Sequence, residues 1–209
     1  MAAVHPEDSF GNRAAELIRS GRFFYERGWV PATAGNFSAR LDDGHVLITV
    51  SGRHKGELSP EDFLVVDLEG QVRSEGKKPS AELPLHLQLY RRDASVGAVL
   101  HTHSLSATLL SRLHREELVL EDYEVLKALQ GIQTHQTRVV VPVFANDQDV
   151  PRLAARVQEY MAEHEGLHGY LIAGHGFYTW GRSVAEACRH IEAFEFLFAC
   201  EIELRRLGR

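Results

Sequence analysis

The sequence predicts an α/β fold in which helices cover a mixed, largely antiparallel sheet. Short apolar runs of strand length alternate with longer segments in which apolar residues recur every three or four positions, the period of an amphipathic helix. Asp-Gly and Glu-Gly pairs follow several of the short runs, which favours antiparallel hairpins. No repeat, low-complexity tract or linker interrupts the chain, so we expect one domain over residues 1–209.

The first half of the chain predicts a helix, two hairpins and a helix that leads into a buried strand. Each helix is recognised by apolar spacing, and each hairpin by turn residues between apolar runs. In chain order we expect a helix over 9–28, a polar loop that runs into a strand over 33–40, a turn at Asp42-Asp43-Gly44 and a partner strand over 46–50. A helical turn at 59–62, a hairpin over 63–73 around Glu69-Gly70, a helix over 81–92 and a strand over 96–100 follow.

The second half alternates helices with short strands in the same way. Its last helix begins at Ser183, which with Glu186 forms the pattern of a capping box. The other elements that we expect are helices over 105–113, 122–129 and 149–163, and strands over 139–141, 169–173 and 177–180.

The composition is that of an ordinary soluble globular protein. The net charge of -6 gives no reason to expect nucleic acid or an anionic membrane as a partner. No apolar run approaches the roughly 18 residues of a membrane span, and Met1–Asp8 has no signal-peptide pattern. Cys188 and Cys200 lie on one expected helix, about 18 Å apart at about 1.5 Å per residue, so we expect free thiols and a cytoplasmic protein.

The strongest chemical signal is the segment His101-Thr102-His103, which follows the strand expected at 96–100. Residues two apart on a strand point to the same face, so both imidazoles would leave the strand end side by side. Such a pair is a natural set of ligands for a divalent cation such as zinc. The alternative is two surface histidines in a strand-to-helix turn.

A third histidine favours the metal. His175 stands between Gly174 and Gly176, directly after another apolar run, where the backbone can turn sharply and nothing crowds the ring. Three imidazoles with a fourth position left for water or substrate are typical of a catalytic zinc. The same ligands would also accept iron, cobalt or manganese.

Two acidic positions are candidates for proton transfer. Glu82 stands at the start of the helix expected at 81–92, and Glu124 lies in the acidic segment with Glu121 and Asp122. A carboxylate at a helix N-terminus is favourable without any function, so both positions also have a purely structural interpretation. The sequence alone leaves both interpretations open.

Small polar residues and glycines gather at the expected strand ends, where such groups and free backbone N–H can bind a phosphate. Turns use the same residue types for conformational reasons, so this signal is weak. The candidates are Thr33, Gly35, Asn36, Ser51, Gly52 and Ser80.

Together these motifs resemble the class II (zinc-dependent) aldolase, epimerase and dehydratase family. The motifs, in order and at family-like intervals, are Gly35-Asn36-x-Ser38, Ser51-Gly52, Pro79-Ser80-x-Glu82, His101-x-His103 and Gly174-His175-Gly176. The resemblance covers nearly the whole chain. It implies a three-layer α/β/α fold, one Zn2+ per subunit, a small phosphorylated ketose as substrate, and a homotetramer with active sites at subunit boundaries.

The resemblance also implies residue roles. It makes His101, His103 and His175 the zinc ligands, and it places Thr33, Gly35, Asn36, Ser51, Gly52 and Ser80 around the substrate and its phosphate. Glu82 matches the acidic position that in the aldolases acts as base and touches the metal. Glu124 stands where the aldolases have a tyrosine and the dehydratase branch has an acid/base glutamate.

The expected reaction is therefore the loss of water from a ketose phosphate. Glu124 would remove the proton at C3, next to the zinc-polarised carbonyl, and would protonate the departing C4 hydroxyl. A class II sugar-phosphate aldolase or a 4-epimerase would share the metal ligands. A non-catalytic scaffold, the use this fold has in a cytoskeletal protein, would not need all three histidines.

Overall fold

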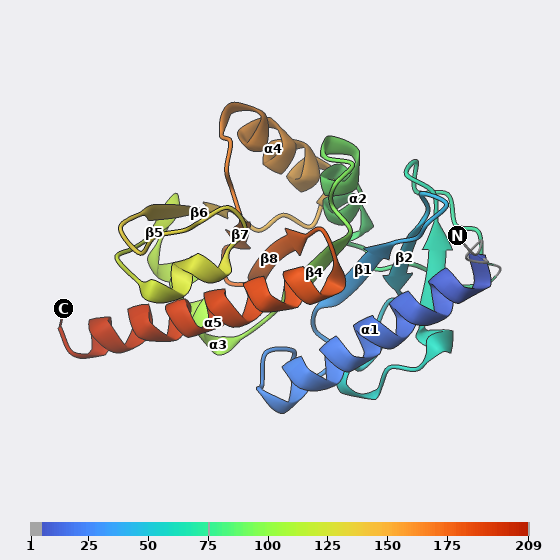
Figure 1. Ribbon diagram of the computed structural model, residues 1–209, viewed down its shortest axis with the longest axis horizontal. Coiled ribbons are helices and arrows are strands. Elements are labelled where there is room, and N and C mark those ends of the chain that lie inside the picture. Colours follow the sequence, from blue (N-terminus) through green and yellow to red (C-terminus); the bar gives the residue numbers. More distant parts are fainter. Residues whose placement is uncertain (1–5, 75, 209) are drawn as a thin grey trace.

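The computed structural model describes residues 6–74 and 76–208; residues 1–5, 75 and 209 of the expected domain lie outside the described residues. Eight strands form one sheet in the order β3-β2-β1-β4-β8-β7-β6-β5 (Figure 1). Among the described residues only β6 and β7 pair in parallel, which confirms a mixed, largely antiparallel sheet. The strands are β1 Asn36–Arg40, β2 Val46–Thr49, β3 Phe63–Val66, β4 Ala98–Thr102, β5 Glu117–Glu121, β6 Arg138–Phe144, β7 Gly169–Ile172 and β8 Gly176–Gly181.

Helices cover both faces of the sheet and make three layers. Helices α2 and α4 pack on one face, and α1, α3 and α5 lie on the other (Figure 1). None of the described helices is long and apolar enough to cross a membrane. The helices are α1 Pro6–Glu26, α2 Leu83–Arg92, α3 Leu105–Leu113, α4 Val150–Glu163 and α5 Val184–Arg206, with 3-10 turns η1 Lys55–Glu57, η2 Pro60–Asp62 and η3 Glu124–Ala128.

Strand alternation decides which layer each side chain of β4 faces. Ala98 and Leu100 belong to the core under α1 and α5, whereas Val99 belongs to the core under α2 and α4. Because side chains on a strand alternate between faces, His101 shares the face of Val99. This histidine is therefore directed to the side of the sheet that α2 covers, while Thr102 faces α5.

The region after α3 differs from the expected helix over 122–129. Residues Glu117–Glu121 instead form the edge strand β5, and only Glu124–Ala128 are helical, as the 3-10 turn η3. Asp122 separates the two with a left-handed φ of 62°, which an α-helix does not allow. The strand was missed because its apolar run, residues 118–120, is short and exposed glutamates stand at both its ends, as is common on edge strands.

The hairpin expected over 63–73 is only half formed. Its first arm is β3, but the second arm makes a single bridge, between Val66 and Val72. At the start of α5, Ser183 is the N-cap residue that the sequence predicts and accepts a hydrogen bond from the Glu186 N–H. The Glu186 carboxylate accepts from the Arg182 N–H instead of completing the capping box.

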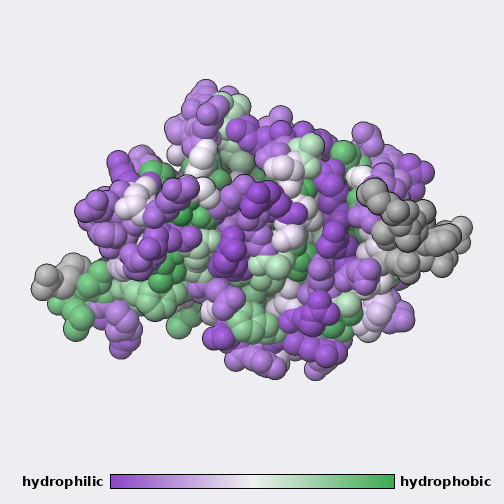
Figure 2. Space-filling view, in the orientation of Figure 1, coloured by the Kyte–Doolittle hydropathy of each residue, from purple (hydrophilic) through white to green (hydrophobic). Residues whose placement is uncertain are grey.

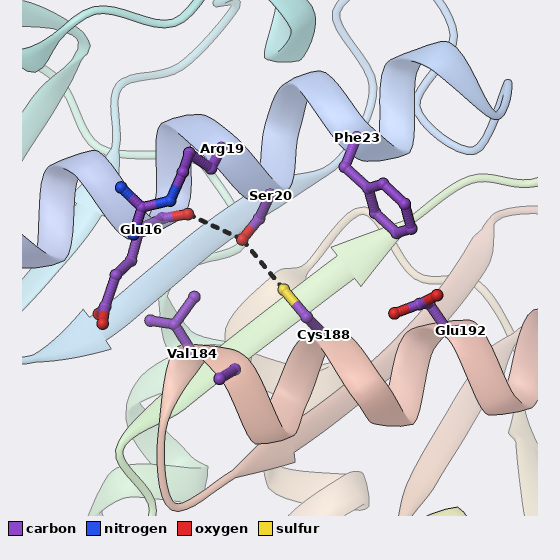
Figure 3. A pocket seen from close by; sticks show the side chains of 8 residues that line it. Glu16, Arg19, Ser20, Phe23, Val184, Cys188 and Glu192 are labelled. Carbon is purple, nitrogen blue, oxygen red and sulfur yellow. Dashed lines mark hydrogen bonds between the residues drawn. The ribbon is translucent and has the colours of Figure 1, made fainter.

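Helices α1 and α5 meet at Ser20 and Cys188 (Figure 3). The Ser20 Oγ lies 3.0 Å from the Cys188 Sγ, and Ser20 also donates to the Glu16 carbonyl one turn earlier. Burial raises the pKa of the Cys188 thiol to about 11, so it stays protonated at neutral pH. Both Cys188 and Cys200 are free thiols, as the sequence predicts.

Several large apolar side chains of α3 and α5 face solvent in the single chain. Figure 2 shows apolar residues gathered at the lower left, where Figure 1 places the C-terminal end of α5. The exposed side chains are Leu105, Leu109 and Leu113 on α3, Phe196 and Leu204 on α5, and Leu207 just after it. Apolar residues concentrated on neighbouring helices are typical of a surface that another protein chain covers.

The buried carboxyl of Glu195 predicts a pH-dependent stability. Glu195 lies on α5 and accepts a hydrogen bond from Thr102 at 3.4 Å. Burial raises the pKa of Glu195 from 4.5 to about 7, and hydrogen bonds from Ser104 and Thr102 act in the opposite direction. Between these values the folded protein binds a proton that the unfolded chain releases. Relative to a variant that lacks this carboxyl, the free energy of unfolding of the wild type should therefore fall, by up to about 3 kcal/mol, as the pH rises from about 5 to about 8.

Urea denaturation of wild type and Glu195→Gln at both pH values checks this prediction. The stability difference between wild type and Glu195→Gln should change in this sense between the two pH values, because glutamine carries no titrating proton. Glu192→Gln, an exposed position on the same helix, should show no such change relative to the wild type. The same pH dependence of stability in the wild type and in Glu195→Gln would contradict the prediction.

Candidate metal centre and active site

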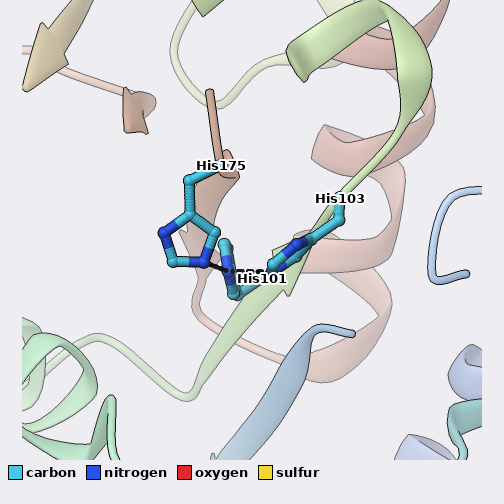
Figure 4. A group of neighbouring side chains, drawn as sticks. All are labelled: His101, His103 and His175. Carbon is cyan, nitrogen blue, oxygen red and sulfur yellow. Dashed lines mark hydrogen bonds between the residues drawn. The ribbon is translucent and has the colours of Figure 1, made fainter. Parts of the chain in front are cut away.

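Three imidazoles meet where β4 ends and β8 begins (Figure 4). The antiparallel pairing of β4 with β8 places His101 opposite Tyr178 and so brings the turn that holds His175 next to His103. The His101 Nε2 lies 2.7 Å from the Nε2 of His103 and 3.4 Å from that of His175. One ligand atom from each ring lies within 4.8 Å of the other two.

The rings direct their Nε2 atoms at one another. The His101 Nδ1 donates to the Phe177 carbonyl at 2.9 Å, which leaves its Nε2 without a proton. Burial lowers the pKa of His101 well below its usual value and that of His103 to about 4, so both rings are neutral. Three imidazole nitrogens this close together are a set of ligands that one divalent cation such as zinc can share.

The two glycines around His175 have steric reasons. Gly174 adopts a left-handed φ of 64°, which a side chain disfavours, and its N–H donates to Ser111. A Cβ at Gly176 would stand 3.0 Å from the His101 ring and 3.2 Å from the His103 ring. The glycine therefore leaves room for the rings to converge.

Glu82 directs its carboxylate at the histidine cluster and makes no side-chain capping bond to α2. Its Oε1 lies 3.0 Å from the His175 Nε2, and its Oε2 lies 3.4 Å from the His101 Nε2. Burial alone would raise the pKa of Glu82, but hydrogen bonds from His175 and Asn36 hold it well below its usual range. Glu82 is thus an ionised group that faces the triad.

Tyr178 completes the surroundings of Glu82. Its hydroxyl donates to the Glu82 Oε2 at 2.8 Å, and its ring stacks on His101 with centroids 3.9 Å apart. Burial and the nearby Glu82 raise the pKa of Tyr178 well above its usual value, so the hydroxyl keeps its proton. Tyr178 carries no functional signal in the sequence, because an aromatic residue in a strand is typical of a core.

Three of the candidate phosphate residues lie against the metal centre. Asn36 is buried, and its Nδ2 donates to the Glu82 Oε2 at 2.5 Å. The Ser80 Oγ accepts from the Glu82 N–H at 3.3 Å. Gly35 has a left-handed φ of 79°, and a Cβ there would stand 2.6 Å from the His101 carbonyl oxygen.

The other candidates, Thr33, Ser51 and Gly52, are exposed on two loops that one buried lysine joins. The Lys55 Nζ donates to the Thr33 carbonyl at 3.0 Å and to the Arg53 carbonyl at 2.5 Å, and only 1% of the residue is exposed. Burial lowers its pKa to about 8, while Asp62 and Glu82 act in the opposite direction. No sequence signal identified Lys55, although its charge would favour an anion at these loops.

Glu124 lies apart from this centre within one chain. It is exposed on η3, where its carboxylate contacts Lys127 and lies 3.5 Å from the His135 Nδ1. The hydrogen bond from Lys127 lowers its pKa. Among the described residues of a single chain, no contact joins Glu124 to the three histidines.

The chain matches the family described as Class II Aldolase and Adducin N-terminal domain over residues 15–202. A methylthioribulose-1-phosphate dehydratase from Methylococcus capsulatus is 60% identical over 203 residues, which cover 97% of this chain and 99% of that protein. The protein of the same name from Pseudomonas aeruginosa is 55% identical over 93% of this chain and 95% of its own length.

Solved structures share the fold. YgbL from Escherichia coli, a putative aldolase/epimerase/decarboxylase, superposes with a TM-score of 0.80 and is 29% identical, over 94% of this chain and 90% of that one. The L-fuculose-1-phosphate aldolase from Thermus thermophilus gives a TM-score of 0.76 at 31% identity, over 95% and 96% of the two chains. These matches agree with the observed α/β architecture.

The convergence of three imidazoles predicts that His101→Ala abolishes stoichiometric binding of a divalent metal, because the variant keeps only two of the three imidazole ligands. Metal content of purified protein and zinc titration of stripped protein measure the effect. His164→Ala, which removes an exposed histidine on the far end of α4, is the matched control and should bind metal like wild type. Equal metal content in His101→Ala and wild type would rule out this centre.

Proposed function

The chain belongs to the Class II Aldolase and Adducin N-terminal domain family, and we propose that it is a lyase that dehydrates 5-methylthioribulose 1-phosphate. The product is 2,3-diketo-5-methylthiopentyl 1-phosphate, which places the reaction in methionine salvage. The observation that carries this proposal is the 60% identity to a methylthioribulose-1-phosphate dehydratase over nearly the full length of both chains. The geometry of the triad and of Glu82 supplies chemistry that such a reaction needs.

We assign one zinc ion per subunit to His101, His103 and His175, since three converging imidazole nitrogens suit this ion. When bound, the ion supplies Lewis-acid polarisation of the ketose carbonyl at C2. Three protein ligands leave a coordination position for the substrate. The substrate phosphate is assigned to Thr33, Gly35, Asn36, Ser51, Gly52 and Ser80, with the buried ammonium of Lys55 behind their loops.

The two carboxylates have different tasks in this proposal. Glu82 keeps its charge, because its pKa is held low, and such a group is a poor proton donor near neutral pH. Glu124 takes the proton from C3 and gives it to the hydroxyl that leaves C4 as water. The resulting C3 enol becomes a ketone when C4 gains a proton, so Glu124 ends the cycle as a carboxylate.

Glu124 can act only if the protein is an oligomer whose sites lie at subunit boundaries. Within one chain its carboxylate is exposed and contacts Lys127 and His135. We therefore propose a homotetramer in which Glu124 reaches the triad of a neighbouring copy. The exposed apolar side chains of α3 and α5 support such an assembly.

The first prediction from this function concerns the reaction itself. Zinc-loaded protein incubated with 5-methylthioribulose 1-phosphate should give a product that is lighter by one water, and metal-stripped protein should not. Mass spectrometry of the mixture measures this. Cleavage of L-fuculose 1-phosphate with no loss of water from the first substrate would instead indicate an aldolase, the activity named for the Thermus thermophilus relative.

A second prediction concerns Glu124. Glu124→Gln should lower kcat by about 10²- to 10⁴-fold, the usual contribution of general acid–base catalysis, and should leave bound zinc unchanged. Steady-state kinetics and metal content measure the two effects. Glu121→Gln, an exposed neighbour at the end of β5, is the matched control. Activity of Glu124→Gln within a few-fold of wild type would show that another group moves the protons.

Mixed oligomers test whether Glu124 acts across the boundary. Subunits with Glu124→Gln and subunits with His103→Ala are each inactive alone, but a hybrid holds some sites with an intact triad and an intact Glu124 from the neighbour. Random mixing of equal amounts in a cyclic assembly should restore up to about a quarter of wild-type activity. Hybrids that form but restore none would place Glu124 in the site of its own subunit.

A further inference from the structure

A chain of buried polar groups leads away from Glu82 between α2 and β1. Glu82, His86 and Tyr90 follow one another at four-residue intervals on α2, so they lie along one face of the helix. Asn36 and Ser38 lie two apart on β1 and share the face of the sheet that α2 covers. The two sets interleave, so that each β1 residue lies between two of the α2 residues.

Every link of this chain is a hydrogen bond. The Tyr90 hydroxyl lies 2.8 Å from the Ser38 Oγ, which lies 2.7 Å from the His86 Nδ1. The His86 Nε2 contacts the Asn36 Oδ1, and the Asn36 Nδ2 lies 2.5 Å from the Glu82 Oε2. His86 and Ser38 are fully buried, Tyr90 is 1% exposed and Asn36 is 5% exposed. Water therefore cannot replace a missing partner at these positions without a cavity.

The hydrogen bonds along this chain are consistent with one direction of donation throughout. Because an ionised carboxylate only accepts, Asn36 must turn its NH2 towards Glu82 and its carbonyl oxygen towards His86. His86 must then donate from Nε2. Burial lowers the pKa of His86 to about 4, so the ring is neutral and carries its only proton there. The Nδ1 is consequently an acceptor and receives a hydrogen bond from the Ser38 hydroxyl. Ser38 in turn accepts a hydrogen bond from the Tyr90 hydroxyl.

The consequence appears at Glu82. Asn36 and Tyr178 both donate to its Oε2, which leaves the Oε1 facing His175 at 3.0 Å. If the Asn36 amide turned over, its carbonyl oxygen would face the carboxylate and repel it. His86 prevents that turn, because the reversed amide would also put an NH2 group against the ring N–H. His86 thus controls the carboxylate without touching it.

We propose that His86 is a positioning residue of this centre: as a neutral ring with its proton on Nε2, it fixes the Asn36 amide and so directs the Glu82 carboxylate to the three histidines. The catalytic part of this inference rests on the proposed dehydratase function, whereas the tautomer does not. In this proposal Asn36 also orients Glu82, besides making the phosphate contact assigned above. Its carbonyl oxygen is hydrogen-bonded to His86, and one hydrogen of its amide NH2 group is hydrogen-bonded to Glu82.

The proposal is tested first on the wild-type protein by ¹⁵N NMR of the histidine rings in the zinc-loaded state. His86 should be a neutral ring protonated on Nε2 from about pH 5.5 to about 8.5, because its pKa lies near 4. This readout requires neither substrate nor activity. A proton on Nδ1, or a charged ring in this range, would overturn the proposal whatever the reaction of the protein is.

The second test compares two substitutions. A glutamine can donate to Asn36 and accept from Ser38 as the ring does, whereas a leucine can do neither. We expect His86→Leu to lower kcat at least tenfold, with KM and bound zinc little changed, and His86→Gln to recover most of the loss. Equal kcat in His86→Leu and wild type, or equal losses in both variants, would overturn the proposal.

His190 provides the matched control. It is 2% exposed, its Nδ1 donates to the Trp180 carbonyl at 2.8 Å, and its Nε2 accepts from the Gln130 N–H. It has no contact with Glu82. His190→Leu should lower stability without changing kcat per folded site. If wild type shows no dehydratase activity, the proposed function fails and the NMR measurement alone decides the role of His86; if His86→Leu does not fold, His86→Gln and the NMR measurement decide it.

Discussion

The structure depends on the mutual approach of three imidazoles and one carboxylate. Each ring directs a nitrogen at the same small volume, and the Glu82 oxygens lie 3.0 and 3.4 Å from two of those nitrogens. Polar groups gathered this closely lose water, so the surrounding fold must hold them in place. It does so through the β4–β8 register, the bond from His101 to the Phe177 carbonyl and the absence of a side chain at Gly176. Binding of a divalent cation by the three histidines would offset the free-energy cost of holding them together.

The same constraint explains why polar residues occupy the layer between α2 and β1. When one oxygen of a buried carboxylate faces the triad, the other oxygen needs a hydrogen-bond donor. In a buried layer the remaining polar atoms of that donor need hydrogen bonds as well. Asn36, His86, Ser38 and Tyr90 meet this requirement in turn, with Tyr178 as a second donor to Glu82. Their spacing by four on the helix and by two on the strand lets the two elements interleave. The polar residues on this face of α2 are thus explained by the hydrogen bonds that the Glu82 carboxylate requires.

The sequence predicted the parts of the centre that rest on local geometry. His101 and the glycine-flanked His175 were identified because strand alternation and glycine turns act over a few residues. The role of Glu82 was left open, since its spacing fits a helix start equally well and only the fold brings it to the triad. His86 had a usable signal, four residues after Glu82 on the same helix face. Lys55 had none, because its burial arises from contacts with two loops that are distant in the chain.

In a single chain, Glu124 lacks the environment that the proposed proton transfer requires. A group that both removes and returns a proton works best with a pKa near the working pH, yet in one chain the pKa of Glu124 is lowered by Lys127 and its carboxylate faces water. Helix α3 begins two residues after His103 and exposes Leu105, Leu109 and Leu113. Another copy packed on this face would exclude water near the triad and desolvate any carboxylate it brought there, which raises a carboxyl pKa. Assembly would then supply both the position and the proton affinity that the isolated chain lacks.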